Sequence, residues 1–404
     1  MPQRLKMLLG FLALIGVTAL LGFLGYWFLF RHPPAVIDVD EEEEEETVGG
    51  LTGSEDAGEI DEDQLTEEEL GILEALEALE GVEVSAVQLT SSTVLSTTLT
   101  ADGTIAYYDP SDGRFYTIDE NGNIVALSNE QFPSAETVLF SDEAEMVAIE
   151  FPDGSNVLYD FAAEEQTTLP SHWEEFEFSP ESEEVISKNI TVDPGSTSLV
   201  VTSTDGSKTQ VIASLGTNEE FVTLDWSPDG DVVGFSQTGL AQTGFGREQI
   251  FLIGADGESV GAIVVEGLMF DSIWAPSGDT LLYSVADVSQ SYRPTLWSVD
   301  ISGSDIGTDR MRYGVETWVE KCTFADSTTV YCAVPREIND GEGLDIELVD
   351  SPDDVYEIDI TSGRAELVAA PTTDYQMFNL NITEGEDTLY FTDENGILLR
   401  ISLD

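Results

Sequence analysis

Residues 226–236 read WSPDGDVVGFS, and residues 274–284 repeat the pattern as WAPSGDTLLYS. In both stretches an aromatic residue precedes a polar turn containing Pro, Asp or Gly, and an apolar run follows. The tight reversal needs residues that fix φ or accept a positive φ, and a run of β-branched and aromatic residues favours a strand. Each stretch therefore predicts two antiparallel strands joined by a short turn.

The same pattern recurs along most of the chain. Weaker units begin at Leu99, Phe140, Phe178, Phe324 and Leu380. Most units continue into a third strand and several into a fourth, at a pitch of about 40–50 residues, which is typical of propeller blades. Two β-sandwiches would also give many short strands, but they would not repeat this signature at that pitch. Turns near residues 101, 141, 179, 227, 275, 325 and 384 thus predict an all-β, seven-bladed β-propeller of four-stranded blades.

The last unit stops after its third strand, at Asp404, so its blade needs a fourth strand from elsewhere. Val82–Leu89 reads VEVSAVQL and alternates apolar and polar residues. We expect this segment to complete the last blade, since that closure leaves no long open sheet edge. The propeller is therefore predicted to occupy residues 82–404.

The units at Phe178, Trp226 and Trp274 resemble the WD40-like repeat of bacterial TolB-type propellers, which also occurs in the propellers of prolyl-oligopeptidase-type peptidases. The resemblance covers roughly residues 84–404. It implies a secreted or envelope propeller that contacts other proteins through its faces. A hydrolase domain accompanies the propeller in the peptidases; this sequence stops with the propeller, so that activity is not expected.

Residues 7–30 contain no charged residue, and 24 helical residues at about 1.5 Å each span a bilayer core of about 30 Å. Arg4 and Lys6 precede the run, which places residues 1–6 in the cytoplasm by the positive-inside rule. A cleaved signal peptide is the alternative, but its apolar region is usually about 7–15 residues long. We therefore expect a single-pass membrane protein whose propeller lies outside the cytoplasm.

Two segments separate the predicted anchor from the propeller. Residues 31–63 are acidic and include a run of glutamates at 41–46, so repulsion predicts an extended, disordered linker. Residues 64–80 predict an amphipathic helix with a capping box at its start. Its apolar stripe either packs on the propeller flank or binds a partner; the stripe consists of Leu65, Ile72, Leu76 and Leu79.

The chain is strongly acidic, with 80 Asp and Glu against 14 Lys and Arg, and a net charge of −66. The acidic linker does not explain this excess, because residues 81–404 alone hold 60 acids and 11 bases. Such a surface repels nucleic acid and anionic lipid. It favours cations, a basic protein or peptide partner, or a high-salt medium.

Motifs for catalysis are few in the sequence. A Gly-x-Ser-x-Gly pattern occurs once, as GESVG at residues 257–261, within a strand repeat and not at the strand-to-helix turn of a nucleophile elbow; there is no phosphate-binding loop, and the two histidines are His32 and His172. A histidine-rich zinc site and a serine triad are thereby disfavoured. Carboxylates are abundant, so a hydrolase or lyase acting on glycan or peptide through two carboxylates stays open. A converging acid pair with raised pKa values at the central channel would favour that alternative.

Calcium is the one cofactor that the sequence suggests. Candidate ligands lie on turns of the first unit, at Asp109, Asp112, Asp119 and Asn121. Hard cations prefer carboxylate and carbonyl oxygens, but Asp-Gly and Asn-Gly turns are also ordinary hairpin chemistry.

Two insertions interrupt the repeat between second and third strands. One covers residues 336–353 in the sixth unit and the other residues 237–246 in the fourth. Loops held on a rigid scaffold often carry function, so we expect partner contacts at Arg336, Asp345, Glu347 and Gln242. The predicted function is a non-enzymatic, envelope-anchored scaffold that binds a protein or peptide. A structural surface component is a further alternative.

The two cysteines, Cys322 and Cys332, flank a short turn in KCTFADSTTVYCAV. Pairing Phe324 with Val330 across this hairpin places the cysteines opposite each other, about 4.5 Å apart at Cα, which suits a disulfide. Two buried thiols are the alternative, and a register slip of one residue would separate the side chains.

Overall fold

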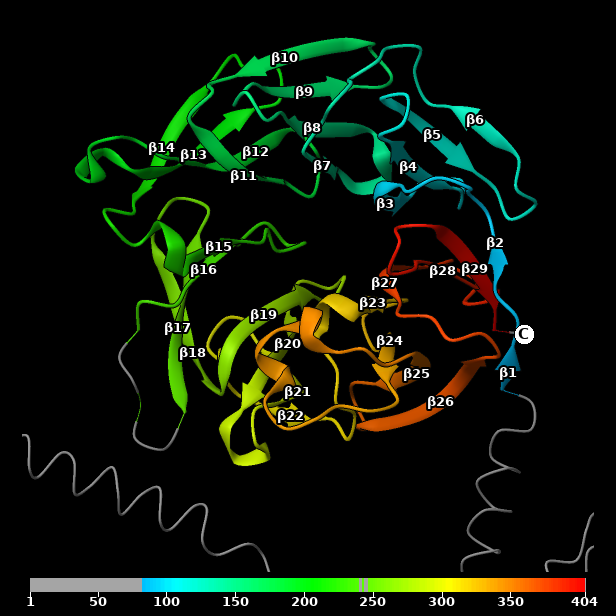
Figure 1. The fold of residues 1–404 in the computed structure, drawn as a ribbon. Coiled ribbons are helices and arrows are strands. Elements are labelled where there is room, and N and C mark those ends of the chain that lie inside the picture. Colours follow the sequence, from blue (N-terminus) through cyan, green and yellow to red (C-terminus); the bar gives the residue numbers. More distant parts are fainter. Residues whose placement is uncertain (1–81, 240–241, 243–245, 404) are drawn as a thin grey trace, which may run out of the picture. The chain divides into compact units, whose positions relative to one another are not determined.

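The computed structural model describes residues 82–239, 242 and 246–403. The chain divides into two compact units, residues 1–64 and 65–404, and every described residue belongs to the second. In this unit the strands form seven sheets, which confirms the all-β, seven-bladed propeller (Figure 1). The predicted anchor at 7–30, the linker at 31–63 and the helix at 64–80 lie outside the described residues. Within the described part, no helix has the length and apolarity needed to cross a bilayer.

The first four blades each contain four antiparallel strands in chain order. Their strands are β3 (Leu95–Leu99), β4 (Ile105–Asp109), β5 (Arg114–Ile118) and β6 (Ile124–Ala126) in blade 1; β7 (Thr137–Phe140), β8 (Met146–Glu150), β9 (Asn156–Asp160) and β10 (Glu165–Leu169) in blade 2; β11 (Trp173–Phe178), β12 (Glu184–Asn189), β13 (Ser198–Ser203) and β14 (Thr209–Ser214) in blade 3; and β15 (Val222–Leu224), β16 (Val232–Ser236), β17 (Arg247–Gly254) and β18 (Ser259–Glu266) in blade 4.

The last three blades follow the same plan, with short strands from the start of the described chain added at two outer edges. Their strands are β19 (Leu268–Trp274), β20 (Thr280–Asp287), β21 (Arg293–Asp300) and β22 (Met311–Arg312) in blade 5; β23 (Cys322–Phe324), β24 (Thr329–Pro335), β25 (Asp353–Asp359), β26 (Arg364–Pro371) and β1 (Glu83–Val84) in blade 6; and β27 (Phe378–Ile382), β28 (Thr388–Thr392), β29 (Leu398–Ser402) and β2 (Val87–Gln88) in blade 7.

Short 3₁₀ turns lie between strands. They are η2 (Asp142–Ala144), η3 (Pro194–Ser196), η4 (Glu219–Phe221), η5 (Val288–Gln290), η6 (Val319–Lys321), η7 (Glu342–Leu344) and η8 (Ile346–Leu348).

The seven turns predicted from the sequence all join the first strand of a blade to the second. In each blade the first strand lies nearest the centre of the ring (Figure 1). Of the aromatic residues that define the repeat, Phe140, Phe178 and Trp274 are buried, whereas Trp226 and Phe324 are half-buried. Trp274 stacks on Phe235 of the preceding blade at 5.7 Å between ring centroids. The signature recurs because each blade needs one large side chain to pack against its neighbour.

The predicted closure by Val82–Leu89 is right for one half of the segment and wrong for the other. Strand β2 completes blade 7, because Val87 and Gln88 pair antiparallel with Arg400 and Leu399 of β29. Strand β1 instead pairs in parallel with β26 and becomes a fifth strand of blade 6. The segment passes from the outer edge of one blade to that of the next (Figure 1), so one continuous ladder cannot hold it.

The alternating strands define two faces of the propeller. One face carries the connections between second and third strands and those between blades; we call it the insertion face. The other face carries the remaining turns within blades and is called the turn face. Both predicted insertions lie between second and third strands, β16 and β17 in blade 4 and β24 and β25 in blade 6, and so belong to the insertion face.

Candidate functional site

The insertion of blade 6, residues 336–352, folds back over blade 5. Its helix η7 reaches strands β20 and β21, and Gly341 donates a backbone hydrogen bond to Ser291 O at 2.8 Å. A Cβ atom added at Gly343 would lie 2.4 Å from Tyr292 O, so this contact leaves no room for a side chain. Trp318, Ile338 and Val349 form a small buried cluster beneath the insertion. The insertion is therefore a packed part of the propeller.

Charged contacts hold this insertion at its base and near its middle. At its base, Arg336 donates hydrogen bonds to Asp354 Oδ1 and, at 3.0 Å, to Asp374 Oδ1. Near its middle, Asp340 accepts from Arg293 Nε at 3.2 Å. Arg336 thus fixes the insertion from within, although its side chain is still partly exposed.

The other predicted contact residues lie on the same face. Asp345 accepts from the backbone N–H of Glu347 at 3.0 Å and starts η8, whereas the Glu347 side chain points to solvent. Gln242 belongs to the blade 4 insertion, where its backbone N–H donates to Arg247 O at 3.0 Å. The structure therefore places all four predicted residues on the insertion face but on two different blades.

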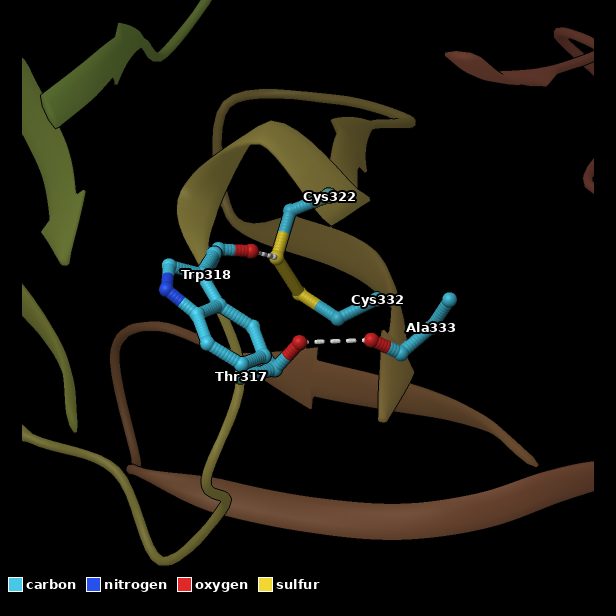
Figure 2. The surroundings of a disulfide bond; sticks show 5 residues. All are labelled: Thr317, Trp318, Cys322, Cys332 and Ala333. Carbon is cyan, nitrogen blue, oxygen red and sulfur yellow. Dashed lines mark hydrogen bonds between the residues drawn. A yellow bond between two sulfur atoms is a disulfide. The ribbon is translucent and has the colours of Figure 1, made fainter. Parts of the chain in front are cut away.

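A disulfide joins Cys322 and Cys332, as the register argument predicted. The two residues face each other across β23 and β24, with Cα atoms 4.0 Å apart. Figure 2 shows that the bond lies beside Trp318, whose carbonyl oxygen contacts Cys322 Sγ at 3.6 Å, and that Thr317 Oγ1 donates to Ala333 O at 2.6 Å. The bond thus links the connection that carries Trp318 to the strand from which the insertion departs.

Carboxylates line one part of the propeller axis. Blades 2 to 6 each contribute one, from an innermost strand or from the residues directly beside it. We call this set the acidic arc: it consists of Asp142, Glu177, Asp225, Asp271 and Glu320. None of the five forms an ion pair within the described residues.

The surrounding protein raises the pKa values of all five carboxyl groups of the arc, and the charges of other members add to this at Glu177, Asp225 and Glu320. By surface area, three members of the arc are exposed and the other two, Glu177 and Asp225, are half-buried. Burial, followed by the charge of Asp271, raises the pKa of Asp225 to about 8. Burial, together with the charges of Asp225 and Asp142, raises the pKa of Glu177 well above its ordinary value. The pKa of Asp271 is raised by burial alone, although a hydrogen bond from the backbone N–H of Ser272 opposes the shift. These carboxylates are crowded by protein yet retain some contact with solvent.

The arc continues to the insertion. Burial raises the pKa of Glu320, and the charges of Asp271 and Asp345 raise it further. The neighbouring Lys321 is engaged elsewhere, since its Nζ lies 2.5 Å from Asp353 Oδ2 and 4.8 Å from the Phe378 ring centroid. Asp345, which the sequence indicated as a contact residue, is therefore electrostatically coupled to the axis.

Blades 7 and 1 present neutral side chains at the corresponding strands. Asn381 Nδ2 of β27 donates to Thr97 Oγ1 of β3 at 3.0 Å, and Asn379 Nδ2 donates to Thr392 Oγ1 at 3.0 Å. The first bond crosses the junction between the last blade and the first, and the second lies within blade 7. We call these four residues the amide sector.

The four predicted calcium ligands do not form one site. Asp109 and Asp112 flank the turn between β4 and β5, and Asp119 and Asn121 lie in the turn between β5 and β6. The two turns are at opposite ends of β5, roughly 15 Å apart at 3.3 Å per residue. Each Asp accepts backbone hydrogen bonds inside its own turn; for example, Asp119 accepts from Asn121 N at 3.0 Å. In the described part of the chain, no group of three or more acids, histidines or cysteines is arranged to hold a metal.

His172 lies exposed in the connection between β10 and β11, where its carbonyl oxygen accepts from Ile190 N at 2.9 Å. The sequence predicted a residue in a connection between strands, and the structure confirms this position. His32 lies outside the described residues.

These features define a class: a seven-bladed β-propeller with an acid-lined axis and a packed insertion on one face. Neither the protein-family models nor the curated proteins gave a match to the sequence. The seven sheets confirm the propeller fold that the resemblance to TolB-type repeats implied. Membership of that family stays a prediction.

Solved propellers share this fold at low sequence identity. An oligogalacturonate lyase in complex with manganese has a TM-score of 0.50 at 14% identity, covering 80% of this chain and 98% of that one. Oligogalacturonate lyase from Vibrio parahaemolyticus has a TM-score of 0.53 at 12% identity, covering 79% and 90%. The β-propeller domain of Cps50 from Myceliophteria thermophila has a TM-score of 0.51 at 12% identity, covering 79% and 99%. At such identities the similarity shows the fold alone.

Proposed function

We propose that this protein is a non-catalytic binding module whose insertion face and acidic arc recognise a positively charged protein or peptide. The acidic arc carries the proposal. Five blades place a carboxylate at the axis, and no cation of the described residues is paired with any of them. Like charges that face one another across a narrow, protein-walled channel repel each other and attract cations, so a Lys- or Arg-bearing segment is the complementary ligand.

The arc runs from the turn face, where Asp142, Glu177 and Asp225 lie at the ends of innermost strands, to Glu320 on the insertion face. At that end Asp345 of the insertion acts on Glu320. Leu344 and Leu348, in the two short helices of the insertion, are exposed. Met269, at the start of the innermost strand of blade 5, is 60% exposed as well. Apolar side chains beside acidic ones suit a basic partner that also has apolar anchors.

We further propose that the module is held in the cell envelope by residues 7–30, with the propeller outside the cytoplasm. The disulfide Cys322–Cys332 supports this location, because such bonds persist in oxidising compartments. Protease added to intact cells should release a fragment that begins within residues 31–80. Protection of the propeller until the membrane is broken would contradict this topology.

A hydrolase or lyase is the second candidate, and the arc also provides its main support. A carboxyl group with a pKa of about 8, such as Asp225, is protonated at neutral pH and could act as a general acid beside an ionised neighbour. The propeller neighbours include oligogalacturonate lyases. However, oligogalacturonate is a polyanion, and a chain with a net charge of −66 and acids at its axis repels it. A glycan or peptide without negative charge would be the better substrate.

The function can be tested with the full chain in detergent micelles. A fluorescent decalysine peptide should bind, whereas a decaglutamate peptide should not. D225N/D271N should weaken decalysine binding at least tenfold. D256N/D305N is the matched control, because it replaces the same number of carboxyl groups in exposed turns of the same two blades and should change affinity less than twofold. Equal affinities of the two double variants would contradict the proposal, and turnover of a neutral glycan that D225N abolishes would favour the enzyme.

A further inference from the structure

Helix η6 holds two successive residues in opposite surroundings. Glu320 is exposed and belongs to the acidic arc, whereas Lys321 is only 2% exposed. The helix packs against the innermost strands of blades 5 and 7 and against β24 of its own blade. Neighbouring residues of a 3₁₀ helix project about 120° apart and cannot turn independently. The way in which Lys321 is held therefore sets the direction of Glu320.

Three parts of the fold meet at the buried ammonium group of Lys321. Its Nζ lies 2.5 Å from Asp353 Oδ2 and 4.8 Å from the centroid of the Phe378 ring. Asp353 is 0% exposed, and the same Oδ2 accepts a hydrogen bond from Met377 N at 2.6 Å. Asp353 follows the insertion directly and begins β25, while Met377 and Phe378 lie at the start of blade 7. The ion pair thus joins η6, the end of the insertion and the next blade.

The arrangement of this pair is not the one that stability alone would favour. Asp353 Oδ1 is buried and has no hydrogen-bond partner among the described residues. Burial lowers the pKa of Lys321 and raises that of Asp353, and each partner's charge only opposes these shifts. Apolar residues of similar volume often replace a buried ion pair without loss of stability. What the pair provides is one fixed distance between η6 and the end of the insertion.

The two elements that the pair connects both carry carboxylates of the proposed binding surface. Glu320 extends the arc to the insertion face, and Asp345 belongs to the insertion. Burial and the charge of Asp271 raise the pKa of Glu320, and the charge of Asp345 raises it further. Within the described part of the chain, neither Glu320 nor Asp345 forms an ion pair. Lys321 and Asp353 are too deeply buried to meet a ligand, so their effect on binding must pass through these two carboxylates.

We propose that Lys321 and Asp353 are positioning residues of the binding site, whose ion pair holds η6 and the insertion so that Glu320 and Asp345 meet a bound cation together. The inference rests on the proposed function and names two residues that touch no ligand. A Lys- or Arg-bearing segment then finds both carboxylates already in place. Since they are fixed before the segment arrives, less conformational entropy is lost on binding.

Decalysine binding by the full chain in detergent micelles tests this role with K321M/D353N. Both residues are changed together, because K321M alone would leave Asp353 buried without an opposite charge. The double variant keeps the net charge, and its unfolding midpoint should stay the same or rise. Its affinity should fall about fivefold, as expected when a ligand must order one more side chain. R364M/E366Q is the matched control, since it removes an exposed ion pair from the same blade and should leave the affinity unchanged.

An E320Q/D345N background separates positioning from a merely structural role. There, K321M/D353N should cause no further loss of affinity, because the carboxylates through which the pair acts are gone. Binding is measured well below the unfolding midpoint of every variant, so that a loss reflects the folded protein. Full affinity of K321M/D353N, or an equal loss in both backgrounds, would overturn the positioning role alone, provided that the wild type binds decalysine and not decaglutamate. A wild type that binds neither peptide would overturn the proposed function as well.

Discussion

The acidic arc and the amide sector occupy equivalent places in the ring but differ in chemistry. In blades 7 and 1, Asn381 and Thr97 satisfy each other's polar groups across the junction where the ring closes. In blades 2 to 6, the axis-side acids repel one another and are not paired within the described chain. Satisfied polar groups stabilise a fold, whereas like charges held close together destabilise it, and titratable groups with strongly shifted pKa values cluster at functional sites. We therefore assign closure to the amide sector and binding to the arc.

Removing the closing segment should have the largest effect and would test the closure side of this comparison. Deletion of residues 82–90 removes both β1 and β2, and it exposes β29 as an open edge. We expect aggregation or loss of cooperative unfolding, measured by thermal unfolding and size-exclusion chromatography. Deletion of nine residues of the acidic linker, 41–49, serves as the control. A monomeric, cooperatively unfolding 82–90 deletion would show that the ring does not need these strands.

Breaking the disulfide removes a covalent link in blade 6, which is the last blade of the acidic arc and lies next to blade 7 of the amide sector. The bond closes a short loop in blade 6, next to the insertion, so C322S/C332S should lose at most about 3 kcal/mol of unfolding free energy in the chain-entropy model. Alkylation of the denatured, unreduced wild type, followed by mass spectrometry, should find no free thiol. Two alkylated cysteines would mean that the bond does not form.

Neutralising Asp225 of the arc should raise the unfolding free energy, whereas the other variants should lower it. The folded-state pKa of Asp225 is about 8, above its ordinary value of 3.8, so the folded state holds the proton more tightly than the unfolded state does. This contribution is complete below about pH 4 and is lost as pH rises through about 8. The full shift corresponds to roughly 6 kcal/mol at about 1.4 kcal/mol per pKa unit, but Asp225 is only half-buried and water screens its charge. D225N should thus be more stable than wild type at pH 9, by about 2 kcal/mol, with the difference shrinking toward pH 4. Denaturant unfolding at pH 5 and pH 9 measures this, and a pH-independent difference would contradict the assignment.

Removing the Asn381 side-chain hydrogen bonds of the amide sector should have the smallest effect on stability. N381A removes the hydrogen bonds from Nδ2 to Thr97 Oγ1 and to Asn379 O. A loss of about 1 kcal/mol is expected, without any change in decalysine affinity. If N381A weakened binding as strongly as D225N/D271N does, the division between closure and binding would be wrong.

Much of the fold could be predicted from the sequence, because the repeat combines a large apolar residue, aromatic in five blades and leucine in two, with a turn in every blade. The turn positions and the cysteine register follow from period-two alternation, which local sequence records. The split of Val82–Leu89 between two blades could not be predicted, since a strand of two residues leaves no periodic pattern. That split depends on where the outer edges of blades 6 and 7 lie.

The candidate site was harder to predict. The insertions stood out as interruptions of the repeat, but the arc did not, because acids are abundant throughout the chain. A signal was nevertheless present: Glu177 and Asp225 each directly precede the aromatic residue of the signature, and Asp142 follows it by two positions. Aligning the repeats would place these acids at the axis. Three aspartates and Asn121, all in turns, were instead predicted as calcium ligands, and these lie at opposite ends of one strand.

The most direct test of the central claim is to count the protons released when decalysine binds. Titration calorimetry of the full chain at pH 7.5, in two buffers that differ in ionisation enthalpy, gives this number. The account predicts release of a sizeable fraction of a proton per peptide, because a bound cation lowers the pKa of Asp225 from about 8. It also predicts that D225N/D271N binds more weakly and releases fewer protons, whereas D256N/D305N behaves as wild type. Tight binding without proton release, equal in all three proteins, would contradict the assignment of binding to the acidic arc.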